Sequence, residues 1–101
     1  MIVVFDKEYL RDLYASGKAK DKKHRFQPQV IRKYKERIDL LLNIKNIEEL
    51  FVMNALNYEV LVGDKKGISS IRVDRQYRIE FTIKGETLSI INILELSNHY
   101  S

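Results

Sequence analysis

Residues 70–81 read SIRVDRQYRIEF, and their alternation in polarity decides the fold. An apolar residue occupies every second position on either side of the central Asp-Arg-Gln. This period of two is typical of strands with one buried face, so the stretch predicts a β-hairpin. A two-residue turn would mix the apolar and polar faces. A three-residue loop, 74–76, sets Ile71 opposite Ile79 and keeps each face uniform.

The same register places Arg72 directly opposite Arg78 on the polar face of the hairpin. Like charges in such a pair destabilise a sheet by up to about 1 kcal/mol. Two neighbouring guanidinium groups suit a bound phosphate, which they can grip in bidentate fashion. We therefore expect an anion site here. The alternative is that Glu80 and Asp74 neutralise the arginines within a surface ion network.

The remaining sequence predicts a single domain over residues 1–101 with helices in the first half and strands in the second. The order predicts an α+β fold, with an N-terminal strand and two to three helices packed on one face of a mainly antiparallel sheet. The expected elements are a strand at 2–5, a helix from a cap at Asp6 to Gly17, a helix at 28–43, a turn capped by Asn46, and strands at 58–62, 68–73, 77–83 and 88–96.

The last two strands are expected to form a second hairpin. A two-residue turn at Gly85-Glu86 would set Ile83 opposite Leu88, and Phe81 opposite Ile90. The last strand carries apolar residues on both faces, which predicts a central place in the sheet.

Composition narrows the class of protein. The 101 residues carry a net charge of +4 with a pI near 9.3, which favours a polyanionic partner. The chain has no cysteine and only two histidines, which excludes disulfides and makes a metal site unexpected; no cofactor is expected either. The sequence has no signal-peptide pattern and no long apolar run, so a cytoplasmic protein is expected.

A second basic feature lies between the two predicted helices. The segment from Lys18 to Arg25 carries five cations against Asp21 alone. It is either a solvated loop or a patch that contacts phosphates, and His24 within it is expected to be solvated. Together with cations of the later turns, it gives the candidate RNA-binding residues: Lys22, Lys23, Arg25, Lys65, Lys66 and Arg75.

RNA can be cleaved without a metal ion when a base deprotonates the 2′-OH, cations stabilise the phosphorane and an acid protonates the leaving oxygen. Histidine is the usual proton carrier near neutral pH, which makes His99 a candidate, beside Tyr100. The other available acid–base groups are Tyr58, Tyr77, Glu59 and Glu80.

The chain resembles the HigB branch of the RelE-like toxins of bacterial toxin–antitoxin pairs. The specific part of the resemblance is the strand pair Ser70–Val73 and Gln76–Ile79, followed by Phe81. The opening strand and helix and the turn from Leu61 to Gly67 also resemble the family, so that nearly the whole chain is covered.

The resemblance implies a ribosome-dependent mRNA endonuclease that is inhibited by a helix-turn-helix antitoxin, which also binds operator DNA. Arg72 and Arg78 carry over as phosphate-binding groups that stabilise the transition state. The sequence departs from the family at Glu59, where a histidine is usual, and at Val62, where a lysine is usual. Lys65 or Lys66 could restore that charge.

The C-terminus departs as well, because it reads Asn98-His99-Tyr100 where the family ends in Asp-Tyr-His. Either His99 and Tyr100 do the same work in swapped order, or the cleavage mechanism is altered or weak. The departures leave two alternatives open. One is a fold relative that poisons DNA gyrase by binding, and the other is a degenerate toxin that only binds its antitoxin.

Overall fold

The computed structural model describes residues 1–85 and 89–98. The elements are β1 (Ile2–Phe5), α1 (Glu8–Ser16), α2 (Pro28–Asn43), the 3-10 turns η1 (Ile47–Val52) and η2 (Asn54–Leu56), β2 (Glu59–Val60), the 3-10 turn η3 (Gly63–Lys65), β3 (Ser69–Arg72), β4 (Tyr77–Lys84) and β5 (Ile90–Asn98). No helix among these residues is long and apolar enough to cross a membrane.

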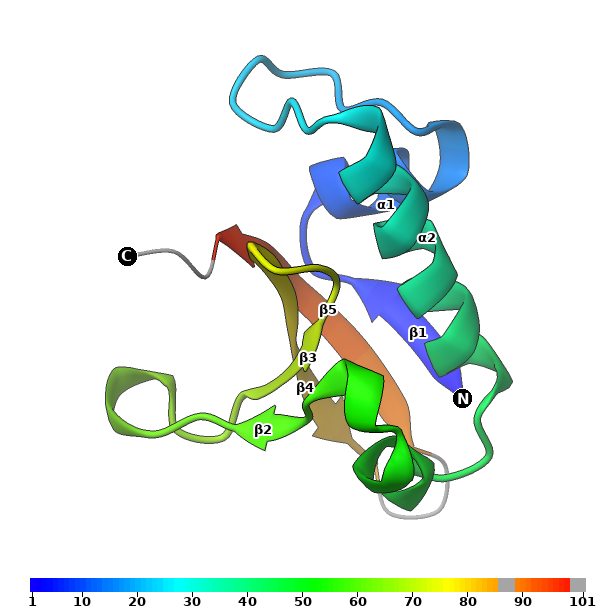
Figure 1. The fold of residues 1–101 in the computed structure, drawn as a ribbon, viewed down its shortest axis with the longest axis vertical. Helices are drawn as coiled ribbons and strands as arrows, with labels where there is room; N and C mark the ends of the chain where they lie inside the picture. The colour runs from blue at the N-terminus through cyan, green and yellow to red at the C-terminus, as the bar shows by residue number, and fades with distance from the viewer. Residues whose placement is uncertain (86–88, 99–101) are drawn as a thin grey trace.

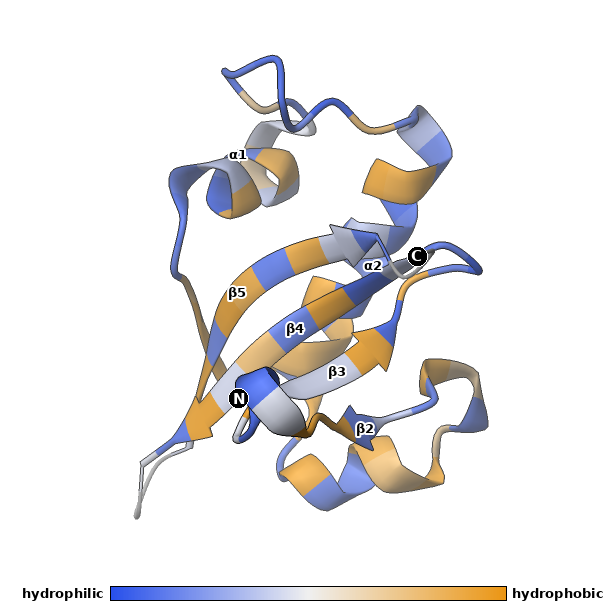
Figure 2. Ribbon diagram, turned by 90° about the vertical axis from the view of Figure 1, so that its left-hand side faces the viewer, coloured by the Kyte–Doolittle hydropathy of each residue, from blue (hydrophilic) through white to orange (hydrophobic). Residues whose placement is uncertain are grey.

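The five strands form one sheet in the order β1-β5-β4-β3-β2. β1 runs parallel to β5, and the other neighbouring pairs are antiparallel. Helices α1 and α2 lie on one side of the sheet (Figure 1), while Figure 2 shows the strands from the side that no helix covers. The predicted α+β fold is confirmed, as is the central place of the last strand. We call the uncovered side the open face.

The hairpin between β3 and β4 has the predicted register, with Ile71 opposite Ile79 and Arg72 opposite Arg78. Its loop contains no glycine. The side chain of Asp74 stabilises the turn instead. The Asp74 carboxylate accepts hydrogen bonds from the backbone amides of Gln76 and Tyr77, both at 2.8 Å. This side-chain turn closes the loop and fixes the register.

The N-terminal elements match their predicted positions except at the first cap. Asp6 does not cap α1, because the N-cap position falls at Lys7 and no side-chain cap hydrogen bond is made. The Asp6 amide donates to the Ile93 carbonyl at 2.8 Å and so extends the β1–β5 pairing. The helix begins after an extended Lys7. It ends as predicted at Gly17, whose φ of 75° suits a residue without a side chain. Asn46 caps η1 as predicted, through a capping box with Glu49.

Two predictions for the strands are wrong. The strand expected at 58–62 is reduced to the two residues of β2, because the chain bends on both sides, at Asn57 and at Gly63, where φ is positive. The second hairpin pairs Ile83 with Ile91, and Phe81 with Ile93. Burial of Ile91 and Ile93 against the helices selects this register. It requires a connection longer than two residues, of which 86–88 lie outside the described residues.

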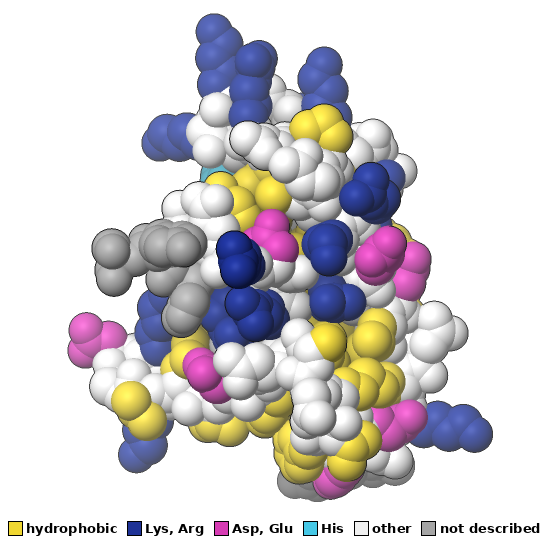
Figure 3. Space-filling view, in the orientation of Figure 1, with side chains coloured by type: hydrophobic (Ala, Val, Ile, Leu, Met, Phe, Trp, Pro, Cys, Tyr) yellow, Lys and Arg dark blue, Asp and Glu magenta, His cyan; other side chains and the backbone are white. Residues whose placement is uncertain are grey.

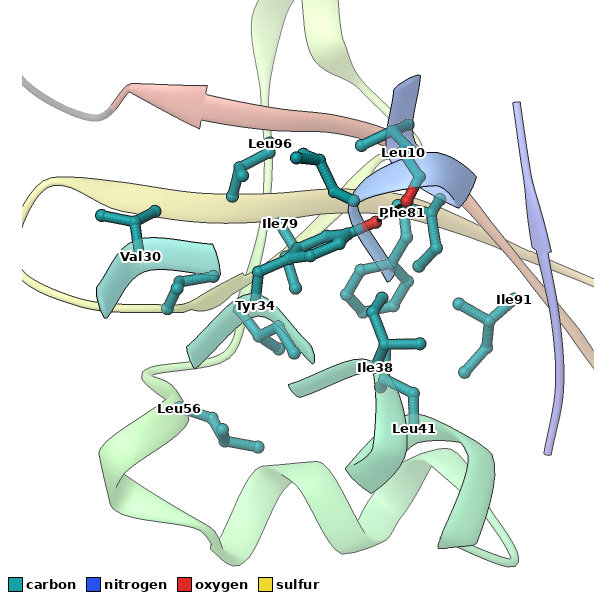
Figure 4. Close-up of a cluster of buried hydrophobic side chains, with 14 of the residues drawn as sticks. Leu10, Val30, Tyr34, Ile38, Leu41, Leu56, Ile79, Phe81, Ile91 and Leu96 are labelled. Carbon is teal, nitrogen blue, oxygen red and sulfur yellow. Dashed lines mark hydrogen bonds between the residues drawn. The ribbon is translucent and has the colours of Figure 1, made fainter. Parts of the chain in front are cut away.

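The core lies between α1, α2 and the helix-facing side of the sheet. Tyr34 of α2 is fully buried there, among Leu10, Ile79 and Phe81 (Figure 4). Its hydroxyl donates to the Leu10 carbonyl at 2.7 Å and thereby joins the two helices. Burial raises the pKa of Tyr34 well above its ordinary value, so the hydroxyl stays protonated as a donor. This bond sets how α1 and α2 lie above the sheet.

The contribution of this bond can be measured with Tyr34→Phe, which keeps the ring and removes the hydroxyl. We expect the free energy of unfolding in urea to fall by about 1 kcal/mol, because a buried hydrogen bond is lost. The matched control is Tyr14→Phe, which removes a hydroxyl that bonds Asp39 at the exposed surface. We expect a loss below about 0.5 kcal/mol there, and equal losses for the two variants would contradict this account.

Candidate functional site

Arg78 lies on the open face, and its side chain is only 7% exposed. Three hydrogen bonds hold the guanidinium in place. Its Nε donates to Ser70 Oγ at 2.5 Å, and its Nη2 donates to the carbonyls of Asn57 at 2.6 Å and Ser70 at 3.3 Å. Among the described residues no hydrogen bond of its Nη1 is found. The guanidinium is thus held in a fixed position, and the Arg78 side chain lines a pocket.

The partners of Arg78 come from two different parts of the chain. Ser70 lies on β3, diagonally across the hairpin, and is 1% exposed. Asn57 ends η2 in the left-handed conformation, with φ 43° and ψ 57°. Asparagine tolerates this conformation better than most residues. The turn at Asn57 brings its carbonyl to the guanidinium, so that a short irregular segment completes a site built mainly on the sheet.

The charges around Arg78 only partly compensate one another. Burial lowers the pKa of the Arg78 guanidinium, the Glu59 carboxylate raises it, and neighbouring Arg72 lowers it. The Glu59 carboxylate lies 3.9 Å from Arg78 Nη2, and its side chain is 46% exposed. Arginine remains charged in such surroundings. The site therefore presents a partly compensated positive charge beside one accessible carboxylate.

Arg72 is exposed, and its Nε donates to the Asp74 carbonyl at 3.1 Å. Neither of the carboxylates expected to neutralise the arginines pairs with them. Asp74 is used within the loop, and Glu80 binds Lys65 Nζ at 2.8 Å and 3.1 Å. Among the described residues, the alternative of a surface network therefore lacks direct ion pairs of Glu80 or Asp74 with the arginines, although the Glu80 charge still acts on Arg78 at longer range.

A pocket of about 320 Å³ opens beside Arg78 on the open face. Arg78, Ser70 and Glu80 line it from β3 and β4, Ser97 and Asn98 line it from β5, and Glu59, Leu61, Val62 and Lys65 line it from β2 and the turn that follows. Predicted site residues Arg78 and Lys65 thus share one cavity with Glu59. Lys66 is exposed and does not line the pocket.

The basic segment 18–25 lies at the other end of the molecule, beyond the helices (Figure 1), where basic side chains project at the top of Figure 3. Lys22, Lys23 and Arg25 are exposed. His24 is not solvated as predicted, because its ring stacks on Tyr9 with centroids 3.5 Å apart. It also contacts the Asp21 carboxylate at 2.9 Å.

The end of this segment reaches the β3–β4 hairpin. Phe26 packs edge-on against Tyr77, with ring centroids 5.3 Å apart. Arg75 is exposed at the tip of the same hairpin. The predicted RNA-binding cations therefore fall into two groups, one at the pocket and one around the basic segment and hairpin tip.

Two other candidate acid–base groups of the described residues, Tyr58 and Tyr77, do not line the pocket. The Tyr58 hydroxyl shares a hydrogen bond with Ser69 Oγ at 2.8 Å, and the Tyr77 ring packs on Phe26. Predicted catalytic residues His99 and Tyr100 lie outside the described residues. No group of three metal-binding side chains occurs within residues 1–85 and 89–98.

Sequence reasoning missed the two residues that hold Arg78. Ser70 was visible as part of the polar face, since it alternates with Ile71. The role of Asn57 depends on a backbone carbonyl and a positive φ, which the sequence around it does not indicate.

The fold is similar to those of several solved bacterial toxins. The YoeB/ParE toxin from Agrobacterium tumefaciens superposes with a TM-score of 0.62 at 19% identity, over 99% of this chain and 100% of that one. YafQ from E. coli gives 0.63 at 12% identity, over 96% and 91%. The YoeB–YefM complex from Staphylococcus aureus gives 0.54 at 19% identity, over 99% and 98%. At these identities the likeness concerns the fold alone.

None of the curated proteins compared with the chain matches it. The sequence model of the family described as the RelE-like toxin of type II toxin–antitoxin system HigB matches residues 3–97. The chain therefore belongs to this family of HigB-like toxins, as the strand pair around Arg72 and Arg78 indicated.

The importance of Ser70 for the buried cation can be tested by Ser70→Ala. We expect the free energy of unfolding to fall by about 1.5–3 kcal/mol, because a buried charged donor loses its partner. Ser69→Ala is the control, since Ser69 is also buried on β3 but bonds an uncharged hydroxyl. It should cost about 1 kcal/mol. The free energies of unfolding of both variants are measured by urea denaturation. An equal or larger loss of stability for Ser69→Ala would contradict the role of Ser70 as the partner of Arg78.

Proposed function

We propose that the protein is a metal-independent endoribonuclease that cuts mRNA on the ribosome and so inhibits translation in the cytoplasm. The observation that carries the proposal is Arg78, a cation that hydrogen bonds hold in a buried position and that lines an open pocket. Preorganised donors of this kind stabilise charge that develops in a transition state. Cleavage of RNA develops extra negative charge on the phosphate.

In this reaction Arg78 and Arg72 bind the scissile phosphate and stabilise the phosphorane. Glu59 is the base in our proposal, because its carboxylate is accessible and lies 3.9 Å from Arg78. It removes the proton of the 2′-OH, and the 2′-oxygen then attacks phosphorus. The bond from phosphorus to the 5′-oxygen breaks, and His99 or Tyr100 protonates the leaving oxygen.

The exposed cations serve binding in this proposal. Lys65 acts at the pocket, and Lys66 on the same turn. Lys22, Lys23, Arg25 and Arg75 contact the RNA backbone farther away. Contacts of this kind supply affinity without sequence preference and weaken with salt.

We also propose that an antitoxin with a helix-turn-helix domain binds and inhibits the protein, and that operator DNA is contacted only through it. Membership of a family of type II toxins supports such a partner. The similar YoeB of Staphylococcus aureus has been solved together with YefM.

The first prediction of this proposal concerns Arg78→Ala. We expect cleavage to fall by about 10²–10³-fold, the typical cost of removing one preorganised donor. Primer extension on mRNA in translating ribosomes measures the cut sites. Lys22→Ala is the control and should lose much less. Because Arg78 is buried, Arg78→Lys is measured as well, and thermal melting shows which variants are folded. Undiminished cutting by a folded Arg78→Ala would refute the proposal.

The second prediction concerns the base. Glu59→Gln should lower the cleavage rate by about 10²–10⁴-fold, the usual contribution of a positioned proton acceptor. Binding of a non-cleavable mRNA should be unchanged or tighter, because a negative charge beside the phosphate is removed. Glu36→Gln, on the exposed side of α2, is the control. A cleavage rate in Glu59→Gln equal to that of the control would exclude Glu59 as the base.

A gyrase supercoiling assay with the same preparations tests one of the two alternatives, the gyrase poison, whereas the degenerate toxin that only binds its antitoxin predicts no growth arrest on expression. Inhibition of supercoiling without new cut sites in mRNA would favour a gyrase poison over a nuclease.

A further inference from the structure

One ion pair of the pocket has no part in the chemistry described so far. Lys65 Nζ lies 2.8 Å and 3.1 Å from the two carboxylate oxygens of Glu80. Glu80 is on β4, two residues after Arg78 and on the same open face. Its side chain is 12% exposed, whereas that of Lys65 is 52% exposed. The carboxylate therefore belongs to the sheet, and the ammonium reaches it from a turn.

That turn has few other attachments to the sheet. Residues 62–67 are all exposed, and there is open space around the α-carbons of Gly63 and Gly67. Its backbone hydrogen bonds are local, from Leu61 to Ile68 and between neighbouring residues. In the described part of the chain, the Lys65–Glu80 pair is the one polar side-chain contact between this turn and β4. Glu80 consequently determines where the Lys65 ammonium lies.

A carboxylate at this position is unfavourable on simple grounds. Burial removes it from water, and a phosphate beside Arg78 would be repelled by it. A polar or apolar residue would avoid both penalties. The ammonium group carries three hydrogens, and the two contacts to Glu80 leave one for a further acceptor in the pocket. The pair thus presents a fixed donor instead of a freely moving lysine.

We propose that Glu80 is a positioning residue that holds the Lys65 ammonium over the pocket, so that Lys65 contacts the same RNA phosphate as Arg78. The inference rests on the proposed function and deepens it, because it assigns the second cation of the phosphate site. It distinguishes Lys65 from Lys66, which is next to it in sequence but does not line the pocket.

The experiment uses ribosomes programmed with an mRNA that carries a 2′-deoxy ribose at the cut site, so that binding is measured without cleavage. Lys65→Met should raise Kd by about tenfold, the value of one charge-assisted hydrogen bond. Lys66→Met should raise it less. Lys84→Met, an exposed lysine at the far end of β4, is the control for net charge and should leave Kd unchanged.

The sign of the effect of Glu80→Gln separates positioning from simple electrostatics. Removal of a negative charge beside a phosphate should tighten binding, whereas loss of the Lys65 anchor should weaken it. We expect Kd to rise by about threefold to tenfold, the range of one ordinary hydrogen bond, because Lys65 remains but loses its fixed position. In the Lys65→Met background the same change should leave Kd unaltered or lower it. A merely structural role of Glu80 does not produce this reversal.

Two further variants keep the test decisive if Glu80→Gln melts at low temperature. Glu80→Asp keeps the charge but shortens the side chain, so it should weaken binding, while Lys65→Arg should largely preserve it. Binding by folded Glu80→Gln and Glu80→Asp as tight as wild type overturns the proposal, as does an equal loss for Lys66→Met and Lys65→Met. Wild-type protein that binds the ribosomes but does not cut mRNA refutes only the nuclease, and failure to bind refutes both.

Discussion

The register between β3 and β4 is the constraint on which the site depends. Ile71 and Ile79 must both face the helices, and in a hairpin this leaves Arg72 opposite Arg78 on the other face. A slip by one residue would bury the arginines against the helices and expose the isoleucines. The Asp74 carboxylate enforces the loop length that prevents such a slip. The free energy gained by burying the core therefore offsets the repulsion between two adjacent cations.

Burial of Arg78 needs an explanation beyond stability. An ionic group taken out of water is costly, and well-packed apolar residues often replace such groups without loss. Here three hydrogen bonds from the protein compensate the guanidinium, and the Arg78 side chain still lines the pocket. Because the cation is held rigidly, it needs no reorganisation when a phosphate binds. In the proposed function, that property serves the binding of the phosphate and the stabilisation of the transition state.

The features that could be predicted from the sequence are those set by local periodicity. The period of two gave the hairpin register, and the helical period with Pro28 and Gly17 gave the bounds of the helices. The register of the second hairpin was predicted wrongly. The turn pattern at Gly85 favours one register locally, but the burial of Ile91 and Ile93 favours another, and that burial is evident only from the whole sheet.

The contacts within the site could not be predicted in this way, because they join segments of the chain that share no periodic pattern of polarity. Lys65 and Glu80 meet across 15 positions of the chain, and Arg78 and Asn57 across 21. Both contacts depend on the path of the irregular segment around β2. The same holds for His24, whose stacking on Tyr9 follows from where the basic segment returns over α1.

The departures from the family pattern are consistent with one another once the pocket is considered as a whole. Val62 and Lys65 line the same cavity, so a lysine three positions farther along the turn can supply the charge absent at Val62 if it is anchored. Glu80 is that anchor. Glu59 differs from a histidine in its chemistry, because a carboxylate accepts a proton but has none to give. A nuclease built on Glu59 therefore needs its acid from another segment. In the function proposed above, that acid is His99 or Tyr100 of the C-terminal segment, separate from the base Glu59.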